Sequence, residues 1–382
     1  MFRTFFHSLA LLAAAHLSFA MPKDSSKAAN ASGVANQTTY QNKSGKITLG
    51  VMLVYMFYQE AAVWQEKLPG TGLGDLFAHN ISIPGLSPLF PQIHCTFSGE
   101  ICQLTTGESE INAAATTMAL MVSNKFDLTQ TYFLLGGIAG VNPKLGSLGS
   151  VAIARFAVQV ALQSGIDPRE LPDGYDTGYI PYDVNHTDEY PVNLYGTEVM
   201  EVSSTVPPDR HTRPPRRGRR SSAATRPRVM HTTPTDITYC MTAQEDNAVL
   251  QVLMRAAGWG LVDYSRKIVT RSGSNFDRPP PNVTAFDHLL GTSSGEFPIA
   301  IENMFLVGVE IVKGILIDWG HAFEKGTRPE NYVGDIFGSL GGEPDFGPGS
   351  TFGGAGAYAD ANEHGDVAMK LFAARPTTGG GK

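Results

Sequence analysis

Carboxylate and amide side chains follow two strand-like runs of the sequence, and they are the residues best placed to do chemistry. Glu60 comes after the buried run 47–56, and Asn275 and Asp277 come just past the run 266–270. Open α/β sheets place ligand-binding groups in the loops at the carboxyl ends of strands. Asp277 can transfer a proton there, whereas the Asn275 amide can only form hydrogen bonds. The alternative for Glu60 is an exposed Glu at a helix N-terminus, where the macrodipole favours it.

A further carboxylate, Glu245, begins a helix-like segment after an extended one and follows the amide of Gln244. The two oxygens of a carboxylate suit it to accept hydrogen bonds from ligand hydroxyl groups. Helix capping, the alternative role, fits Asp246 better than Glu245. We therefore predict that Gln244 and Glu245 bind a ligand.

Glycines cluster at 136–140, directly after the short buried run 132–135. Glycine lets the backbone approach a flat ligand or a tight turn without a clash at Cβ. Gly137, Ala139 and Gly140 are therefore candidate binding positions. The alternative is a simple break between a strand and the next element.

Gly107 stands just before the helix-like segment 111–123, where backbone N–H groups could bind an anion such as phosphate. Glu108 and Glu110 flank this position, and their like charge disfavours phosphate. The sequence therefore favours water over phosphate as a nucleophile here, with Gly107 kept as a candidate binding residue.

The elements that must position these residues alternate between strand-like and helix-like runs. Strand, helix, strand in this order predicts a sheet with helices on its faces. The runs are strands at 47–56, 132–135 and 266–270, a hairpin at 95–105, and helices beginning at Glu60 and spanning 111–123, 245–259 and 299–319.

The two ends of the chain differ in composition from its centre. Residues 1–20 combine Arg3, an apolar run and the small residues before Ala20, which is the pattern of a cleaved signal peptide. We predict a flexible leader at 21–45 and a Gly-rich tail at 341–382. The later apolar stretches contain charged residues, so the mature chain is expected to be secreted or cell-wall associated and not an integral membrane protein.

Composition and sequons agree with such a chain. A formal charge of -7 with 42% hydrophobic residues indicates a globular protein and excludes the basic balance of a nucleic-acid binder. Asn-x-Ser/Thr sequons predict a glycoprotein. They occur at Asn30, Asn36, Asn42, Asn80, Asn185 and Asn282.

Three cysteines are present, and Cys95 and Cys102 lie on either side of a predicted turn. In an oxidising compartment we expect a disulfide between them. Cys240 is then left over.

Six runs resemble, in order across about residues 47–340, the fungal purine nucleoside permease family. They are Leu86-Ser-Pro-Leu-Phe, Glu110-Ile-Asn-Ala-Ala-Ala, Gly136-Gly-Ile-Ala-Gly-Val-Asn-Pro, Gly196-Thr-Glu-Val, Gln244-Glu-Asp-Asn-Ala and Asn275-Phe-Asp-Arg-Pro-Pro-Pro. Beneath that resemblance, the order of glycine loops and carboxylates is similar to the nucleoside phosphorylase and nucleosidase superfamily. The resemblance implies a three-layer α/β/α domain at 46–340 that binds purine nucleosides and splits the bond between ribose and base.

The resemblance also implies roles for individual residues. Glu60 would orient or deprotonate the attacking water, and Glu245 would accept hydrogen bonds from the ribose hydroxyls. An acid in the loop of Asn275 and Asp277 would protonate the leaving purine. Asn275, an amide, departs from this pattern if it occupies the acid's position.

An Arg/Pro-rich segment at 203–236 interrupts the domain and is predicted to be disordered. Relatives resembling this chain carry further sequence between Glu201 and Tyr239, including a second cysteine. We interpret the segment as the trace of a deletion, missed exon or frameshift, which would also leave Cys240 unpaired.

Two functions follow from the sequence. The first is a purine nucleosidase or phosphorylase, with phosphate as a co-substrate only in the second case and no other cofactor. The second is a non-catalytic nucleoside-binding component of an uptake system. A homo-oligomer is compatible with both, and no metal, Ser-His-Asp or Walker motif is visible.

Overall fold

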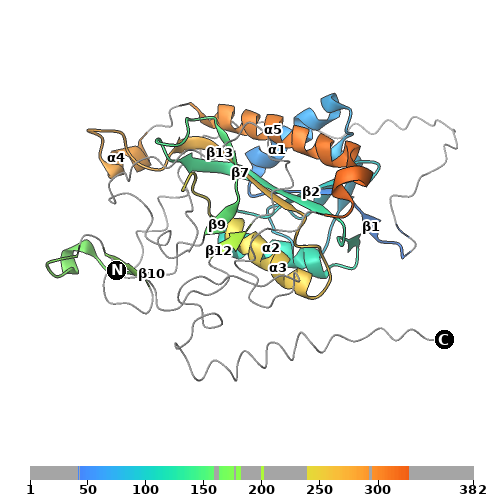
Figure 1. Cartoon of the computed structure of the whole chain (residues 1–382), viewed down its shortest axis with the longest axis horizontal. Helices are drawn as coiled ribbons and strands as arrows, with labels where there is room; N and C mark the ends of the chain where they lie inside the picture. Colours follow the sequence, from blue (N-terminus) through green and yellow to red (C-terminus); the bar gives the residue numbers. More distant parts are fainter. Residues whose placement is uncertain are drawn as a thin grey trace, which may run out of the picture. The chain divides into compact units, whose positions relative to one another are not determined.

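The computed structural model describes residues 42, 44–158, 163–175, 178–181, 199–201, 239–291 and 295–326 (Figure 1). These residues belong to one compact unit, Thr39–Lys382. The predicted signal peptide, nearly all of the leader, the Arg/Pro-rich segment and the tail lie outside them.

A seven-stranded sheet forms the centre, with strand order β3-β4-β5-β2-β7-β13-β8. Its four middle strands run parallel, and the outer strands β3, β4 and β8 pair antiparallel. The strands are β2 (Val51–Tyr55), β3 (His79–Ile81), β4 (Ile93–Cys95), β5 (Ile101–Thr105), β7 (Tyr132–Val141), β8 (Val151–Ile153) and β13 (Lys267–Phe276).

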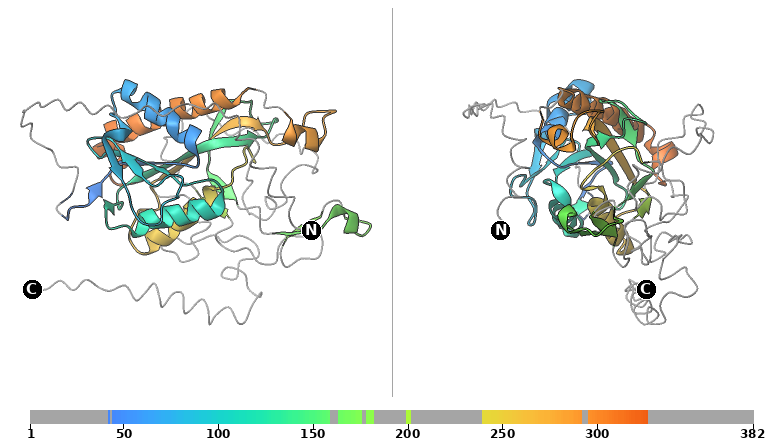
Figure 2. Two further views of the ribbon diagram at one scale, coloured as in Figure 1. Left: turned by 180° about the vertical axis from the view of Figure 1, so that it is seen from behind. Right: turned by 90° about the vertical axis from the view of Figure 1, so that its left-hand side faces the viewer.

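Helices cover both faces of this sheet (Figure 2). On one face lie α1 (Tyr58–Lys67) and α5 (Phe297–Ile317), and on the other lie α2 (Ser109–Val122) and α3 (Asp246–Gly258). Side chains of the buried strand β2 pack against both helix layers, because successive side chains of a strand point to opposite faces. Leu53 packs with the α1/α5 layer, while Met52 and Val54 pack with the α2/α3 layer. The three-layer α/β/α architecture expected from the sequence is confirmed.

Smaller elements complete the described part of the chain. They are the parallel pair β1 (Ile47–Thr48) and β6 (Phe126–Asp127), the antiparallel pairs β9 (Phe156–Val158) with β12 (Val199–Glu201) and β10 (Gln163–Gly165) with β11 (Tyr179–Pro181), helix α4 (Ala285–Leu290), the short helices η1 (Leu68–Thr71), η2 (Leu76–Ala78) and η3 (Pro168–Glu170), and the π-helix η5 (Trp319–Phe323).

Two strands are longer than the sequence indicated. The glycine cluster 136–140 was expected to end a strand, but it lies inside β7, and Asn275 lies inside β13 rather than past it. The two strands pair along nearly their whole length, with a bulge between Gly273 and Asn275. Glycine has low strand propensity, and here the long pairing between neighbouring strands overrides it.

The predicted hairpin and its disulfide are confirmed. Cys95 on β4 and Cys102 on β5 are directly opposite each other and are bonded. Cys240 is a free thiol, and burial raises its pKa.

The helices of the structure were also compared with the length and hydropathy that a membrane span requires. In the part of the chain that the structure describes, no helix is both long enough and apolar enough to span a bilayer.

Two glycines of α5 predict opposite effects of the same substitution. A Cβ at Gly308 would lie 2.6 Å from the indole of Trp64 on α1, whereas a Cβ at Gly314 would meet nothing within 4 Å. We expect Gly308→Ala to lower the free energy of unfolding by about 1–3 kcal/mol through overpacking. Gly314→Ala should raise it by about 0.5–1 kcal/mol, because alanine stabilises a helix interior.

Urea unfolding followed by circular dichroism measures both effects. Equal shifts of the two variants in the same direction would contradict the close packing of α5 on α1.

Candidate functional site

The connections of the parallel strands diverge between β2 and β7, which makes this place a topological switch point. The chain leaves β2 through α1 toward β5, and it leaves β7 through α3 toward β13 on the opposite side and over the opposite face. Ligands of open α/β sheets bind at such a switch point, outside the carboxyl ends of the strands.

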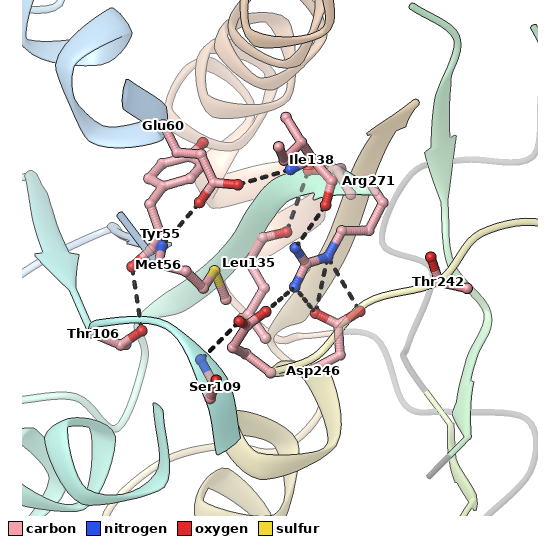
Figure 3. A network of polar contacts seen from close by, with 12 residues as sticks. Tyr55, Met56, Glu60, Thr106, Ser109, Leu135, Ile138, Thr242, Asp246 and Arg271 are labelled. Atoms are coloured by element: carbon pink, nitrogen blue, oxygen red, sulfur yellow. Dashed lines mark hydrogen bonds and ion pairs between the residues drawn. The ribbon is translucent and has the colours of Figure 1, made fainter. Parts of the chain in front are cut away.

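Glu60 occupies this switch point. It lies in the first turn of α1, and its side chain reaches across the end of β2 to β7 (Figure 3). Its carboxylate accepts hydrogen bonds from the backbone N–H of Met56 at 3.0 Å and of Ile138 at 2.7 Å. The residue is 1% exposed, so the alternative of a solvent-exposed helix terminus is wrong.

A buried guanidinium lies beside Glu60. Arg271 on β13 donates to Asp246 through Nε at 3.2 Å and through Nη2 at 2.6 Å, and it lies 3.4 Å from Glu245 Oε2. Its Nη1 donates to the backbone carbonyl of Ile138, the residue whose N–H binds Glu60. Arg271 therefore connects β7, β13 and the start of α3.

Gly137 makes room for this arrangement. A Cβ there would clash with Arg271 Nη1 and would lie 2.8 Å from Glu60 Oε1. One step earlier on β7, a Cβ at Gly136 would lie 2.5 Å from the ring of Tyr55. The glycine cluster thus serves close side-chain approach within a strand.

Opposing influences set the protonation of the two central groups. Burial raises the pKa of Glu60 from 4.5 to about 7, while Arg271 and the two backbone N–H groups lower it. Although burial by itself lowers the pKa of Arg271, the charges of Asp246, Glu245 and Glu60 raise it above its ordinary value. Arg271 therefore stays charged, and Glu60 exchanges its proton near neutral pH.

The start of α2 is bonded to Glu245. The N–H of Ser109 donates to Glu245 Oε1 at 3.0 Å, and Ser109 has the left-handed backbone angle φ of 72°. Gly107, two residues earlier, has φ of 86°, a value that glycine adopts freely. A backbone donor that could have faced a phosphate is therefore occupied by a carboxylate of the chain itself.

Asp277 belongs to a second cluster. Its carboxylate accepts hydrogen bonds from the Tyr239 hydroxyl at 2.6 Å and from Arg278 at 2.7 and 2.6 Å. Burial raises its pKa, but these partners outweigh burial and hold the pKa below its ordinary value. Asp277 is thus held as an anion, while Asn275 is exposed.

The structure therefore divides the predicted site residues into groups. Glu60, Gly137 and Glu245 lie together around Arg271, and Gly107 lies just before the Ser109 contact. Gly140 lies against Asp277 and Thr242, three residues along β7 from Gly137 and so roughly 10 Å away. Two predicted positions remain. Ala139 is buried within β7, and the side chain of Gln244 is exposed to solvent.

Two residues of the cluster were missed from the sequence. Asp246, expected to fit a helix cap, is instead the first residue of α3, whose N-cap is Glu245, and it pairs with Arg271. In the sequence, Arg271 directly follows the strand-like run 266–270, and a cation on a buried strand requires a partner. This need for a carboxylate partner is the sequence signal that could have identified Arg271. Among the described residues, no group of three or more His, Cys, Asp or Glu side chains is placed to hold a metal.

Comparison with known proteins identifies the family. The sequence profile described as "Purine nucleoside permease (NUP)" matches residues 48–207 and 217–328. A purine nucleoside permease of Candida albicans is 38% identical over 356 residues, covering 81% of this chain and 86% of its own length. A probable purine nucleoside permease of Schizosaccharomyces pombe is 37% identical over 318 residues, covering 71% and 90%.

An open α/β protein with a buried carboxylate at its switch point is thus the class that fold and site define. The chain belongs to the purine nucleoside permease family. The alignment with the Candida protein runs over 356 positions but covers only 81% of 382 residues, so part of the relative's aligned sequence has no counterpart in this chain.

Among solved structures, futalosine hydrolase of Helicobacter pylori is similar, with a TM-score of 0.38 and 12% identity. The match covers 71% of this chain and 98% of that one.

The raised pKa of Glu60 predicts a pH-dependent stability. Between pH 4.5 and about 7 the folded chain holds a proton that the unfolded chain releases, so this contribution stabilises the fold below pH 4.5 and is lost as the pH rises through 7. Glu60→Gln removes the ionisable group. The Nε2 atom of the new glutamine would face a backbone N–H donor at every pH, so that cost does not change with pH. The stability difference, wild type minus variant, should fall by roughly 3 kcal/mol across this window.

Urea titrations at several pH values measure that difference. Glu66→Gln, an exposed position on the same helix, is the matched control and should show no change with pH of this size. A constant difference for Glu60→Gln would contradict a pKa near 7.

Gly137→Ala tests the packing of Arg271 and Glu60 against Gly137. The added methyl must displace Arg271 or Glu60, so we expect the free energy of unfolding to fall by about 2 kcal/mol or more. Gly70→Ala is the control, because a Cβ there meets nothing within 4 Å. Equal stability of the two variants, measured by thermal unfolding, would mean that Arg271 and Glu60 leave more room beside Gly137 than the structure indicates.

Proposed function

We propose that this chain binds purine nucleosides at the carboxyl ends of β2 and β7 and hydrolyses their N-glycosidic bond. One observation carries the proposal: Glu60 is a buried carboxyl group at the switch point, with a pKa of about 7. A general base acts best when its pKa lies near the working pH. The purine nucleoside is the ligand class in the names of the Candida relatives.

Glu60 supplies the base in this reaction. A water molecule attacks C1′ of the ribose and forms the new C–O bond, and Glu60 takes one of its protons. The bond between C1′ and the purine nitrogen breaks, and the purine leaves with the electron pair and takes a proton from solvent. General-base catalysis of this kind contributes typically 10²–10⁴-fold to the rate.

Glu245 is proposed to hold the ribose. Its two oxygens already accept from Ser109 N–H and face Arg271, which fixes their direction, and each oxygen has a further lone pair for a hydroxyl donor. A carboxylate oriented by other groups loses less conformational entropy when it binds a ligand.

Hydrolysis is favoured over phosphorolysis by the charges at the start of α2. Glu245 occupies the Ser109 N–H, and Arg271, the cation of the cluster, already faces Asp246 and Glu245. A phosphate would have to displace one of these carboxylates or lie beside them. Water carries no charge and meets no such opposition.

A binding protein for nucleoside uptake is the second candidate, and the base-side loop favours it. Asn275 cannot transfer a proton, and Asp277 is held as an anion by Tyr239 and Arg278. The leaving purine therefore has no protein acid among these residues. Binding without turnover is the expected behaviour if solvent cannot protonate the purine fast enough.

Free base released from inosine, adenosine and guanosine, with and without phosphate, distinguishes these functions. We expect release without phosphate, and a loss of roughly 10²-fold or more in Glu60→Gln but not in the control Glu66→Gln.

Each other outcome has a definite meaning. Release only with phosphate would contradict hydrolysis, whereas nucleoside binding without release would establish the uptake candidate. Absence of both binding and release would overturn the proposed function altogether.

A further inference from the structure

Asn80 lies on the edge strand of the main sheet. It is the acceptor of the sequon Asn80-Ile81-Ser82, and the side chains of Asn80 and Ser82 are both exposed. β3 pairs with β4 on one side only, and no described strand pairs with its outer edge. The sequon is thus open to solvent in the folded chain.

An aromatic surface lies next to this asparagine. His94 on β4 is directly opposite Asn80, and its Nδ1 lies 2.6 Å from Asn80 Oδ1. The ring of Phe77 packs edge-on against the His94 ring, with centroids 5.0 Å apart, and Phe77 remains 49% exposed. Phe77 is held in place by the turn in which its N–H donates to Asp75.

The hydrogen bond with His94 orients the Asn80 amide. Because Oδ1 is turned toward β4, Nδ2 points away from that partner, and no bond to Nδ2 is present among the described residues. A substituent on Nδ2 would leave the His94 bond intact, since Oδ1 keeps its acceptor lone pairs.

We propose that Asn80 carries an N-linked glycan whose first sugar packs on Phe77 and covers the outer edge of β3. In the modification, Nδ2 bonds to C1 of a sugar supplied as a lipid-pyrophosphate-linked oligosaccharide. The C1–O bond breaks, the pyrophosphate leaves with the electron pair, and the amide loses one proton. The apolar face of a sugar ring would cover the exposed ring of Phe77 and remove that apolar surface from water, which is favourable.

The other sequons within the described residues differ from Asn80. The Asn42 side chain is already engaged, because Nδ2 donates to Asp127 and Oδ1 accepts from Ser44 and Lys46. Asn282 is exposed but follows β13, which lies five strand positions from β3, roughly 24 Å away. The first sugar of a glycan at Asn282 cannot reach Phe77 at that separation, so this site serves as an internal control.

A glycan at this place would also protect the sheet. An unpaired edge strand presents backbone donors and acceptors to other chains, and proteins cover such edges to prevent aggregation. β3 is short, and a bulky hydrophilic group on it blocks the approach of a second strand.

Occupancy is measured on protein secreted from a glycosylating yeast host with the host's own signal peptide. Glycans are removed enzymatically in heavy-oxygen water, and the Asn80 peptide is examined by mass spectrometry for the labelled aspartate. We expect Asn80 to be labelled, and Ser82→Ala, which keeps the His94 bond, to abolish the label. An unlabelled Asn80 in secreted protein would overturn the proposal.

The contact with Phe77 is tested by thermal unfolding before and after glycan removal. In the wild type we expect removal to lower the melting temperature by roughly 2–4 °C. In Phe77→Ala, with Asn80 still occupied, removal should have little effect. An equal loss in both proteins would show that the sugar does not pack on Phe77, as would a loss that disappears in Asn282→Gln.

Discussion

The buried charge of Arg271 constrains the carboxyl edge of the sheet more than any other group. A guanidinium cannot lose its proton in a protein, so its burial requires carboxylates within ion-pair distance. Asp246 and Glu245 meet that requirement, and both stand at the start of α3. The pairing therefore fixes where α3 begins relative to β13.

Further contacts follow from the same pairing. Glu245, held beside Arg271, also binds the Ser109 N–H and so ties the start of α2 to the start of α3. Gly137 must lack a side chain, because Arg271 and Glu60 approach it closely. Three helices and two strands are thus positioned around one cation, and the positions of the candidate ligand-binding groups depend on it.

Glu60 and Asp277 show how the surroundings separate two carboxylates. Both are largely shielded, but Asp277 accepts three hydrogen bonds from Tyr239 and Arg278, which hold its pKa below its ordinary value. Glu60 accepts hydrogen bonds from two backbone N–H groups and is attracted by the charge of Arg271. The effect of burial is larger than these, so the pKa of Glu60 rises to about 7. Of the two, Glu60 is the group that can exchange a proton at neutral pH.

The sequence by itself determined the family, the alternation of strands and helices, the hairpin with its disulfide, and Glu60 and Glu245 as candidates. Such features depend on local patterns: apolar runs mark β2 and α5, and a turn between Cys95 and Cys102 brings them together. Tertiary structure alone decided that Gly136–Gly140 continues β7, that Arg271 and Asp246 belong to the site, and that Asp277 does not share the Glu60 cluster. These outcomes depend on strand pairing and ion pairing between residues far apart in the chain. Burial and the charges of distant neighbours, which no local pattern contains, set the protonation of the carboxyl groups.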